Sequence, residues 1–191
     1  MDKLTLIPNT GRVLSSAVYR LVTAPLAAGP KASTVFKDAI FAAIRTHVSN
    51  VTPGQEKWLN TTTKAAYLDL AKQAKFQPET DVLANGIEAH WLGAKSAKKT
   101  ILYFHGGGYV LGATVGHLAW LHDLQRDLST DHDVNIVLPS YTLAPEGQYP
   151  VQMQQGVECL NWLLNDLKKS PSDVRLALQI DTRPRKLTSC L

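Results

Sequence analysis

The chain has 191 residues, of which 45% are hydrophobic and 19% are charged, and its formal net charge at pH 7 is +4. This composition is typical of a globular domain, or of part of a larger one, and it excludes a disordered chain. Lys and Arg are scattered without a basic stripe interleaved with aromatic side chains, so no nucleic-acid partner is expected. The two cysteines, Cys159 and Cys190, cannot form a disulfide framework, which predicts a reducing, cytoplasmic location.

Residues 1–78 are predicted to form an N-terminal helical segment. Ser33 is the expected N-cap of one helix. Apolar side chains follow it at helical spacing, at Phe36, Ile40, Ile44 and Val48. A second helix is predicted over residues 61–74. The apolar stretch 13–28 is interrupted by Arg20 and by a proline, so it is too short to span a bilayer. Membrane contact is not favoured, although a peripheral contact stays open as an alternative.

Residues 79–191 show a different pattern, in which strands and helices alternate. Asn85-Gly86 lies between two apolar runs and predicts a β-hairpin, whose second strand alternates as a half-buried strand would. Continuous apolar runs predict buried strands at residues 100–104, 134–141 and 174–180, with helices around residues 118–128 and 153–164. The predicted fold class is therefore α/β, with a mostly parallel sheet and an antiparallel hairpin at its edge.

Three consecutive glycines follow the first buried strand, in the sequence TILYFHGGGYVLG over residues 100–112. Gly106, Gly107 and Gly108 have no Cβ, so their backbone can approach a ligand closely and turn successive N–H groups toward one point. Ligands of open α/β sheets bind at the carboxyl ends of the strands, and grouped amide donors there stabilise developing negative charge. The run therefore favours an oxyanion hole.

Two alternatives remain for this loop. Gly106, Gly108 and Gly112 loosely fit a dinucleotide-binding pattern, although the next strand ends without the acidic residue that a ribose requires. The glycines would otherwise form a turn with only a structural role. We expect no cofactor, and no Cys/His cluster indicates a metal.

The motifs resemble those of a known family. HGGG at residues 105–108 is followed by YTLAPE at 141–146 and by YPVQMQQGVECLNWLL at 149–164. Together they resemble the hormone-sensitive-lipase-like branch of the α/β hydrolases (α/β-hydrolase fold-3), which includes many carboxylesterases. Thr142 departs from the pattern, because the family usually has Arg there.

The resemblance implies a partial α/β-hydrolase fold that corresponds to the N-terminal portion of the family. Residues 79–191 would be a truncated core, and the helices of residues 1–78 would form part of a cap over the site. Active relatives would cleave small esters through an acyl-enzyme. The resemblance also implies that the amides of Gly107 and Gly108 donate to the oxyanion, within an oxyanion hole of residues 105–108, and that His105 holds the loop.

The nucleophile of this family is absent from the sequence. None of the serines lies in the Gly-x-Ser-x-Gly turn that presents the nucleophile in this fold. Alignment with the family places Thr182 at the nucleophile position, with Ile180 and Pro184 in place of the flanking glycines. No acid and no general-base histidine follow, and the upstream histidines are interpreted as structural. The chain as it stands is therefore predicted to be inactive.

Two alternatives to an inactive esterase copy stay open. The chain is either a non-catalytic binding or dimerisation module, which self-associates through the open edge of the sheet, or a truncated gene product. An open edge and uncovered apolar surface would both favour association.

Overall fold

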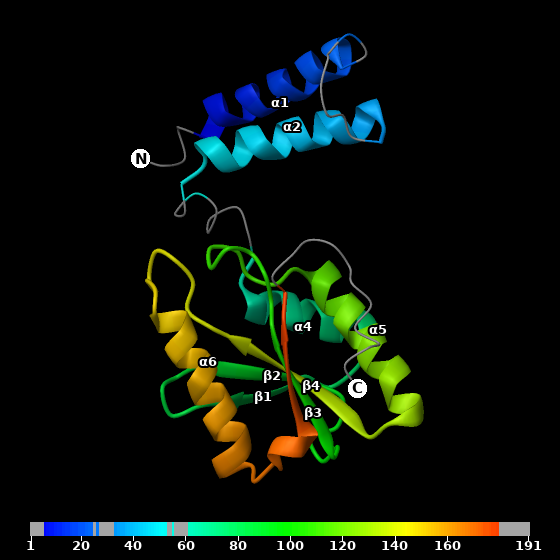
Figure 1. The fold of residues 1–191 in the computed structure, drawn as a ribbon, viewed down its shortest axis with the longest axis vertical. Helices are drawn as coiled ribbons and strands as arrows, with labels where there is room; N and C mark the ends of the chain where they lie inside the picture. The colour runs from blue at the N-terminus through cyan, green and yellow to red at the C-terminus, as the bar shows by residue number, and fades with distance from the viewer. Residues whose placement is uncertain (1–5, 25, 27–32, 53–54, 56–60, 180–191) are drawn as a thin grey trace. The chain divides into compact units, whose positions relative to one another are not determined.

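A computed structural model describes residues 6–24, 26, 33–52, 55 and 61–179. Contacts divide the chain into two compact units, Met1–Leu59 and Asn60–Leu191 (Figure 1). The helix that follows residue 61 packs on the sheet of the second unit. The domain boundary after residue 78 stays a prediction. The cap role of the N-terminal helices stays a prediction.

The first unit contains a pair of helices, α1 (Leu6–Thr23) and α2 (Val35–Asn50). The N-cap of α2 is Thr34 and not the predicted Ser33, because the Thr34 side chain accepts a hydrogen bond from the Lys37 amide at 3.2 Å. Adjacent hydroxyl residues compete for this position, and the sequence does not distinguish them.

The second unit is a five-stranded sheet with helices on both faces (Figure 1). Its strands are β1 (Glu79–Val82), β2 (Glu88–Leu92), β3 (Lys99–Phe104), β4 (Val134–Ser140) and β5 (Val174–Leu178), in the order β1-β2-β4-β3-β5. Its helices are α4 (Thr63–Ala74), α5 (Val115–Asp131) and α6 (Val151–Asn161), followed by the π-helix η1 (Trp162–Asp166) and the 3-10 helix η2 (Pro171–Asp173). The β4-β3-β5 strands are parallel, and β2 is antiparallel to β1 and β4. The predicted fold class is confirmed.

The predicted hairpin joins β1 and β2. Gly86 has φ +82°, a conformation that residues with a side chain rarely adopt, and its amide donates to the Leu83 carbonyl at 2.8 Å. Asn85 Oδ1 accepts from the Ile87 amide at 3.0 Å. The Asn-Gly pair thus sets the turn, as the sequence predicts.

The core lies on both faces of the sheet. Side chains of α4 and α5 cover one face, where Tyr67, Leu118 and Ile136 are fully buried. Residues from α6 and η1 cover the other face, with Cys159 and Leu163 buried. Apolar sheet faces must be covered on both sides in this way when crossover helices lie on each face.

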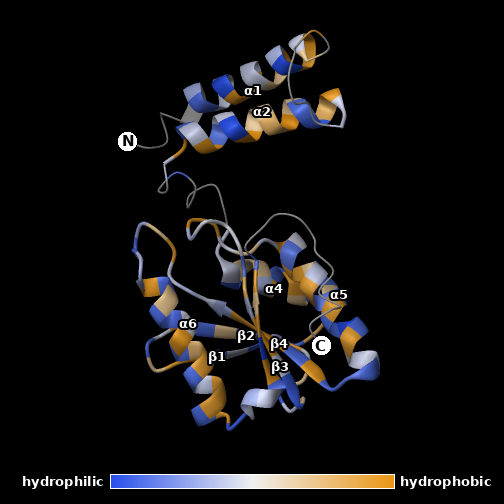
Figure 2. Ribbon diagram, in the orientation of Figure 1, coloured by the Kyte–Doolittle hydropathy of each residue, from blue (hydrophilic) through white to orange (hydrophobic). Residues whose placement is uncertain are grey.

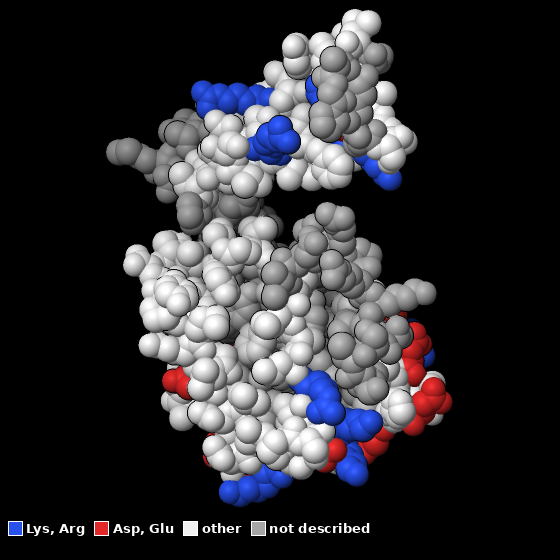
Figure 3. Space-filling view, viewed as in Figure 1, with Lys and Arg blue, Asp and Glu red and all other residues white. Residues whose placement is uncertain are grey.

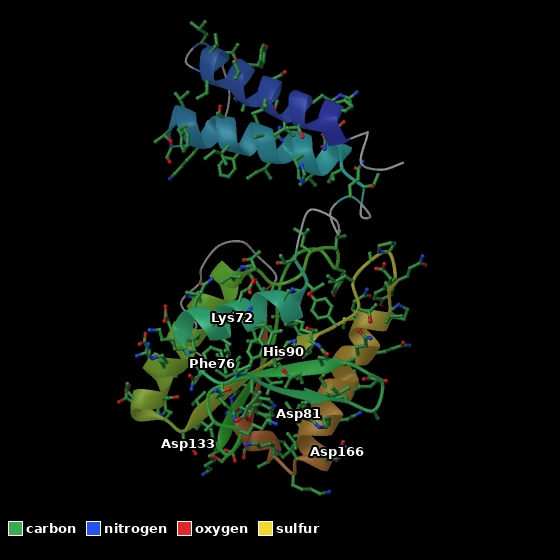
Figure 4. The ribbon with its side chains drawn as sticks, turned by 180° about the vertical axis from the view of Figure 1, so that it is seen from behind. Lys72, Phe76, Asp81, His90, Asp133 and Asp166 are labelled. Atoms are coloured by element: carbon green, nitrogen blue, oxygen red, sulfur yellow. The ribbon has the colours of Figure 1, made fainter. Side chains whose placement is uncertain are left out.

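Strand β2 differs from its predicted half-buried state, because α4 covers its second face. His90 (labelled in Figure 4), which the alternation places on the outer face, is only 1% exposed. Its ring stacks on that of Tyr67, with the ring centroids 4.7 Å apart. Helix α6 differs in a similar way. Its buried side is formed by Gln152 and Cys159, whereas Met153, which supported the helix prediction, is exposed.

Candidate functional site

The loop that follows β3 has the backbone that three glycines allow. Gly107 has φ +123° and Gly108 has φ +61°. A Cβ on Gly107 would lie 2.7 Å from the Leu111 carbonyl oxygen, closer than real contacts allow. The loop therefore requires glycine at position 107 for both its dihedral angle and its space.

Two adjacent amides of this loop have no acceptor among the described residues. The Gly107 carbonyl accepts from the amides of Val110 and Leu111, each at 3.1 Å, and the Gly106 amide donates to Gln179 Oε1 at 3.4 Å. Within the described part of the second unit, the amides of Gly107 and Gly108 donate to no protein group. Gly107 and Gly108 are both exposed, so their two adjacent donors are accessible and can receive an oxygen atom of a ligand.

The loop lines a cavity of about 310 Å³ at the carboxyl ends of β3 and β5. The lining residues include no Asp, Glu, Lys or Arg and are rich in aromatic side chains: Phe104, His105, Gly106, Gly107, Gly108, Tyr109, Tyr141, Gln152, Met153, Gly156, Leu178 and Gln179. In such apolar surroundings a hydrogen bond to a charged oxygen is stronger than in water. The cavity therefore suits a small uncharged organic group with one polar oxygen.

His105 is buried below the loop. Its Nδ1 lies 2.8 Å from the Gly106 carbonyl, to which it donates, and burial lowers the pKa of the imidazole. The Ala113 amide donates to Thr63 Oγ1 at 3.1 Å, and Thr63 Oγ1 in turn lies 3.2 Å from His105 Nε2. Because a neutral ring has one donor and one acceptor nitrogen, the Thr63 hydroxyl donates to Nε2. His105 is thus a neutral residue that links the loop to the start of α4.

The hydroxyl groups beside this imidazole are poor nucleophiles. Thr63 is buried and is not among the residues that line the cavity. Tyr141 donates its hydroxyl proton to the His105 carbonyl at 2.6 Å, and burial raises its pKa. Burial also raises the pKa of Cys159 to about 12, and its thiol lies in the core on the α6 face of the sheet. None of these groups supplies an activated nucleophile.

Gln179 joins three parts of the site. Its Oε1 accepts from the Tyr103 hydroxyl at 2.8 Å as well as from Gly106, and its Nε2 lies 2.8 Å from His117 Nε2. His117, on α5, is therefore the acceptor of the amide N–H. Sequence reasoning missed both this bridge and Thr63. A polar residue at the end of the apolar run 174–180 is the one signal that could have indicated Gln179.

Thr142 stands where the family pattern has Arg, and neutral hydrogen bonds fix its position in place of a salt bridge. Gln155 accepts from the Thr142 amide and donates to its hydroxyl, both at 2.8 Å. Gln152 donates to the carbonyls of Thr142 and Gly147 at 3.0 and 2.9 Å. Two glutamines of α6 therefore fix the turn after β4.

Other sequence predictions have separate outcomes. Thr182, at the predicted nucleophile position, lies outside the described residues. The described residues contain no group of three or more potential metal ligands. A Cβ on Gly112 would lie 3.1 Å from the Thr61 carbonyl and the Thr63 amide, so this glycine of the loose dinucleotide pattern allows close packing against the start of α4.

Comparison with known proteins gives the family. Residues 101–179, which contain the loop and three strands of the sheet, match the family described as alpha/beta hydrolase fold. Over these residues the chain is similar to the α/β-hydrolase family. This confirms the family predicted from the HGGG and YTLAPE motifs.

Similar α/β hydrolases include named esterases. Carboxylesterase 20 of Arabidopsis thaliana is 32% identical over 96 residues, which are 44% of this chain and 29% of that protein. Ethyl acetate hydrolase of Pseudomonas putida is 31% identical over 98 residues, 50% of this chain and 29% of that protein. The crystal structure of an esterase E25 shares the fold with a TM-score of 0.50 and 16% identity, over 67% of this chain and 40% of that chain. The chain thus spans less than a third of these two sequence relatives.

Proposed function

We propose that residues 105–108 form an oxyanion hole inherited from a carboxylic ester hydrolase, with the amides of Gly107 and Gly108 as its donors. The observation that carries the proposal is the pair of amides without an acceptor, in a loop that lines an uncharged cavity. Where one such donor has been removed from an enzyme, the transition state loses about 3–4 kcal/mol of stabilisation. The names of the relatives, a carboxylesterase and an ethyl acetate hydrolase, support an ester as the substrate class.

We further propose that the 191-residue chain does not turn over esters by itself. No Gly-x-Ser-x-Gly occurs in its sequence, and the hydroxyl and thiol groups described around the site are buried or already engaged. An oxyanion hole stabilises charge that a nucleophile creates, so it gives little rate enhancement when no nucleophile is present.

Two measurements on the purified chain test these proposals. We expect no saturable hydrolysis of p-nitrophenyl acetate. We also expect butanoate, whose carboxylate resembles an oxyanion, to shift the amide NMR signals of Gly107 and Gly108 more than that of Gly116 on α5. Hydrolysis that saturates with substrate and is lost in Gly108→Ala would contradict the inactivity. Equal shifts at Gly116 and in the loop would contradict the oxyanion hole.

A second candidate function is association through β5. Among the described strands, β5 pairs only with β3, and its Leu176 and Leu178 are 56% and 62% exposed. An open strand edge that carries exposed leucines is a template for pairing with another chain.

A further inference from the structure

Helices α1 and α2 expose their apolar sides. Six apolar residues recur at spacings of three or four along the two helices and are between 40% and 68% exposed: Leu14, Val18, Leu21, Phe36, Ile40 and Ile44. Such spacing places each set on one face of its helix. Figure 2 shows that hydrophobic and hydrophilic residues are interspersed along both helices.

The two helices pack together through small and polar residues instead. Asn9 and Ala39 are each 4% exposed, the Ser16 hydroxyl lies 3.4 Å from the Ala42 carbonyl, and Arg20 pairs with Asp38 at 2.8 Å. A helix pair in water normally buries its apolar stripe and exposes its polar side. This pair does the reverse, and apolar faces of this extent indicate an interaction surface.

The net charge of the chain is concentrated in the same unit. Residues 1–59 contain seven Lys or Arg and three Asp or Glu, a net charge of +4, whereas residues 60–191 contain thirteen of each kind. Lys and Arg side chains are visible on the helical pair in Figure 3. The surface that binds these helices should therefore have a negatively charged outer layer above an apolar interior.

We propose that α1 and α2 lie on a lipid bilayer with anionic headgroups, their apolar faces buried in the boundary between headgroups and acyl chains. Amphipathic helices with basic residues bind such surfaces through apolar burial and electrostatic attraction together. Lying on a membrane is different from crossing it, and none of the described helices is long and apolar enough to cross one. Arg20, which interrupts the apolar stretch in the sequence, faces Asp38 and leaves the outer face of α1 uninterrupted.

Two other occupants would cover the same faces. A second copy would bring two units of net charge +4 together, which charge repulsion opposes. The cap implied by the family resemblance would cover them through apolar burial alone, which predicts no preference for anionic lipid. The lipid surface alone uses both the apolar faces and the charge.

Vesicle sedimentation of the full chain tests the proposal. We expect binding to phosphatidylcholine vesicles with about 30% phosphatidylserine, weak binding to phosphatidylcholine alone, and weaker binding as salt rises. The double variant Leu14→Gln/Ile44→Gln should lower the partition coefficient about tenfold or more. Lys37→Gln/Arg45→Gln should reduce only the preference for anionic vesicles.

The matched control is Ser15→Gln/Ser49→Gln, which places the same amide at exposed polar positions of the same helices and should bind as the wild type does. Circular dichroism establishes that all variants keep their helices. The proposal is overturned if the wild type does not sediment with anionic vesicles, if it binds neutral vesicles equally, or if Leu14→Gln/Ile44→Gln binds like the control. Light scattering that shows a dimer without vesicle binding assigns the faces to a second copy and overturns it as well.

Discussion

His90 is a titratable residue held neutral inside the fold. Its two ring nitrogens contact the hydroxyls of Thr80 at 2.9 Å and Ser140 at 2.8 Å, and its ring stacks on Tyr67. Burial is the main cause that lowers its pKa from 6.5 to about 4; Glu88 opposes this shift and Lys64 adds to it. Protonation would place an uncompensated charge between the sheet and α4.

Stability should therefore depend on pH through His90. Because the pKa is lower in the folded state, the unfolded state binds more protons between pH 6.5 and about 4. The contribution is fully present above pH 6.5 and decreases as pH falls, by roughly 3 kcal/mol over that window. Urea unfolding at pH 7.5 and 4.5 measures it. His90→Gln should reduce the difference by most of that amount, while His132→Gln, at an exposed position, should leave it unchanged.

The buried His105 has its pKa lowered in the same direction, so it should add to the loss of stability at low pH. An equal pH dependence in the wild type and in His90→Gln would show that His90 is not the group that titrates.

Gly107 should tolerate no side chain. Gly107→Ala meets both a positive φ and a Leu111 oxygen at 2.7 Å, and we expect it to lower the free energy of unfolding by about 2 kcal/mol or more. The matched substitution Gly116→Ala, in the first turn of α5, brings the new methyl group no closer than 4.0 Å to Thr114 Oγ1, an ordinary contact, and should not destabilise the fold. Thermal unfolding of both variants measures the difference, and equal melting temperatures would contradict the close packing described for the loop.

At the scale of secondary structure, local patterns predict which elements form better than which sides they bury. The Asn85-Gly86 turn and the apolar runs of β3 and β4 depend on nearby residues, and the structure has them where the sequence predicts. The buried side of an element depends on what covers it. Thus β2 is buried on both faces because α4 lies across it, and α2 exposes the residues that defined its apolar face.

The β5 edge supports a prediction at this scale. Leu176→Lys adds a charge to an exposed strand edge, so it should reduce self-association of the chain. Val157→Lys is the control, because Val157 is 57% exposed on α6 and is not on a strand edge. Sedimentation velocity at several protein concentrations compares the two variants. If Leu176→Lys and Val157→Lys self-associate equally, the chain does not associate through the edge of β5.

For the whole molecule, the sequence predicts the family and the donors of the site but not the residues that hold them. HGGG and YTLAPE are contiguous motifs, so they can be read directly from the chain. Thr63 on α4 and Gln179 after β5 contact the loop, and His117 on α5 holds Gln179. No local pattern relates residues this far apart. The division of charge between residues 1–59 and 60–191 is likewise present in the sequence. It can be assigned to separate units only after the contacts place the boundary between them at residue 59.

The link between Thr63 and His105 has a consequence for protein engineering. The shape of the glycine loop depends on a hydroxyl 42 positions earlier in the chain, which fills the acceptor nitrogen of a buried ring. A designer who transplants the tetrapeptide of residues 105–108 into another scaffold would leave that ring nitrogen unsatisfied, at a cost of about 1–3 kcal/mol. A transplanted loop would therefore need two segments that are separate in the sequence, residues 105–108 and the first turn of α4.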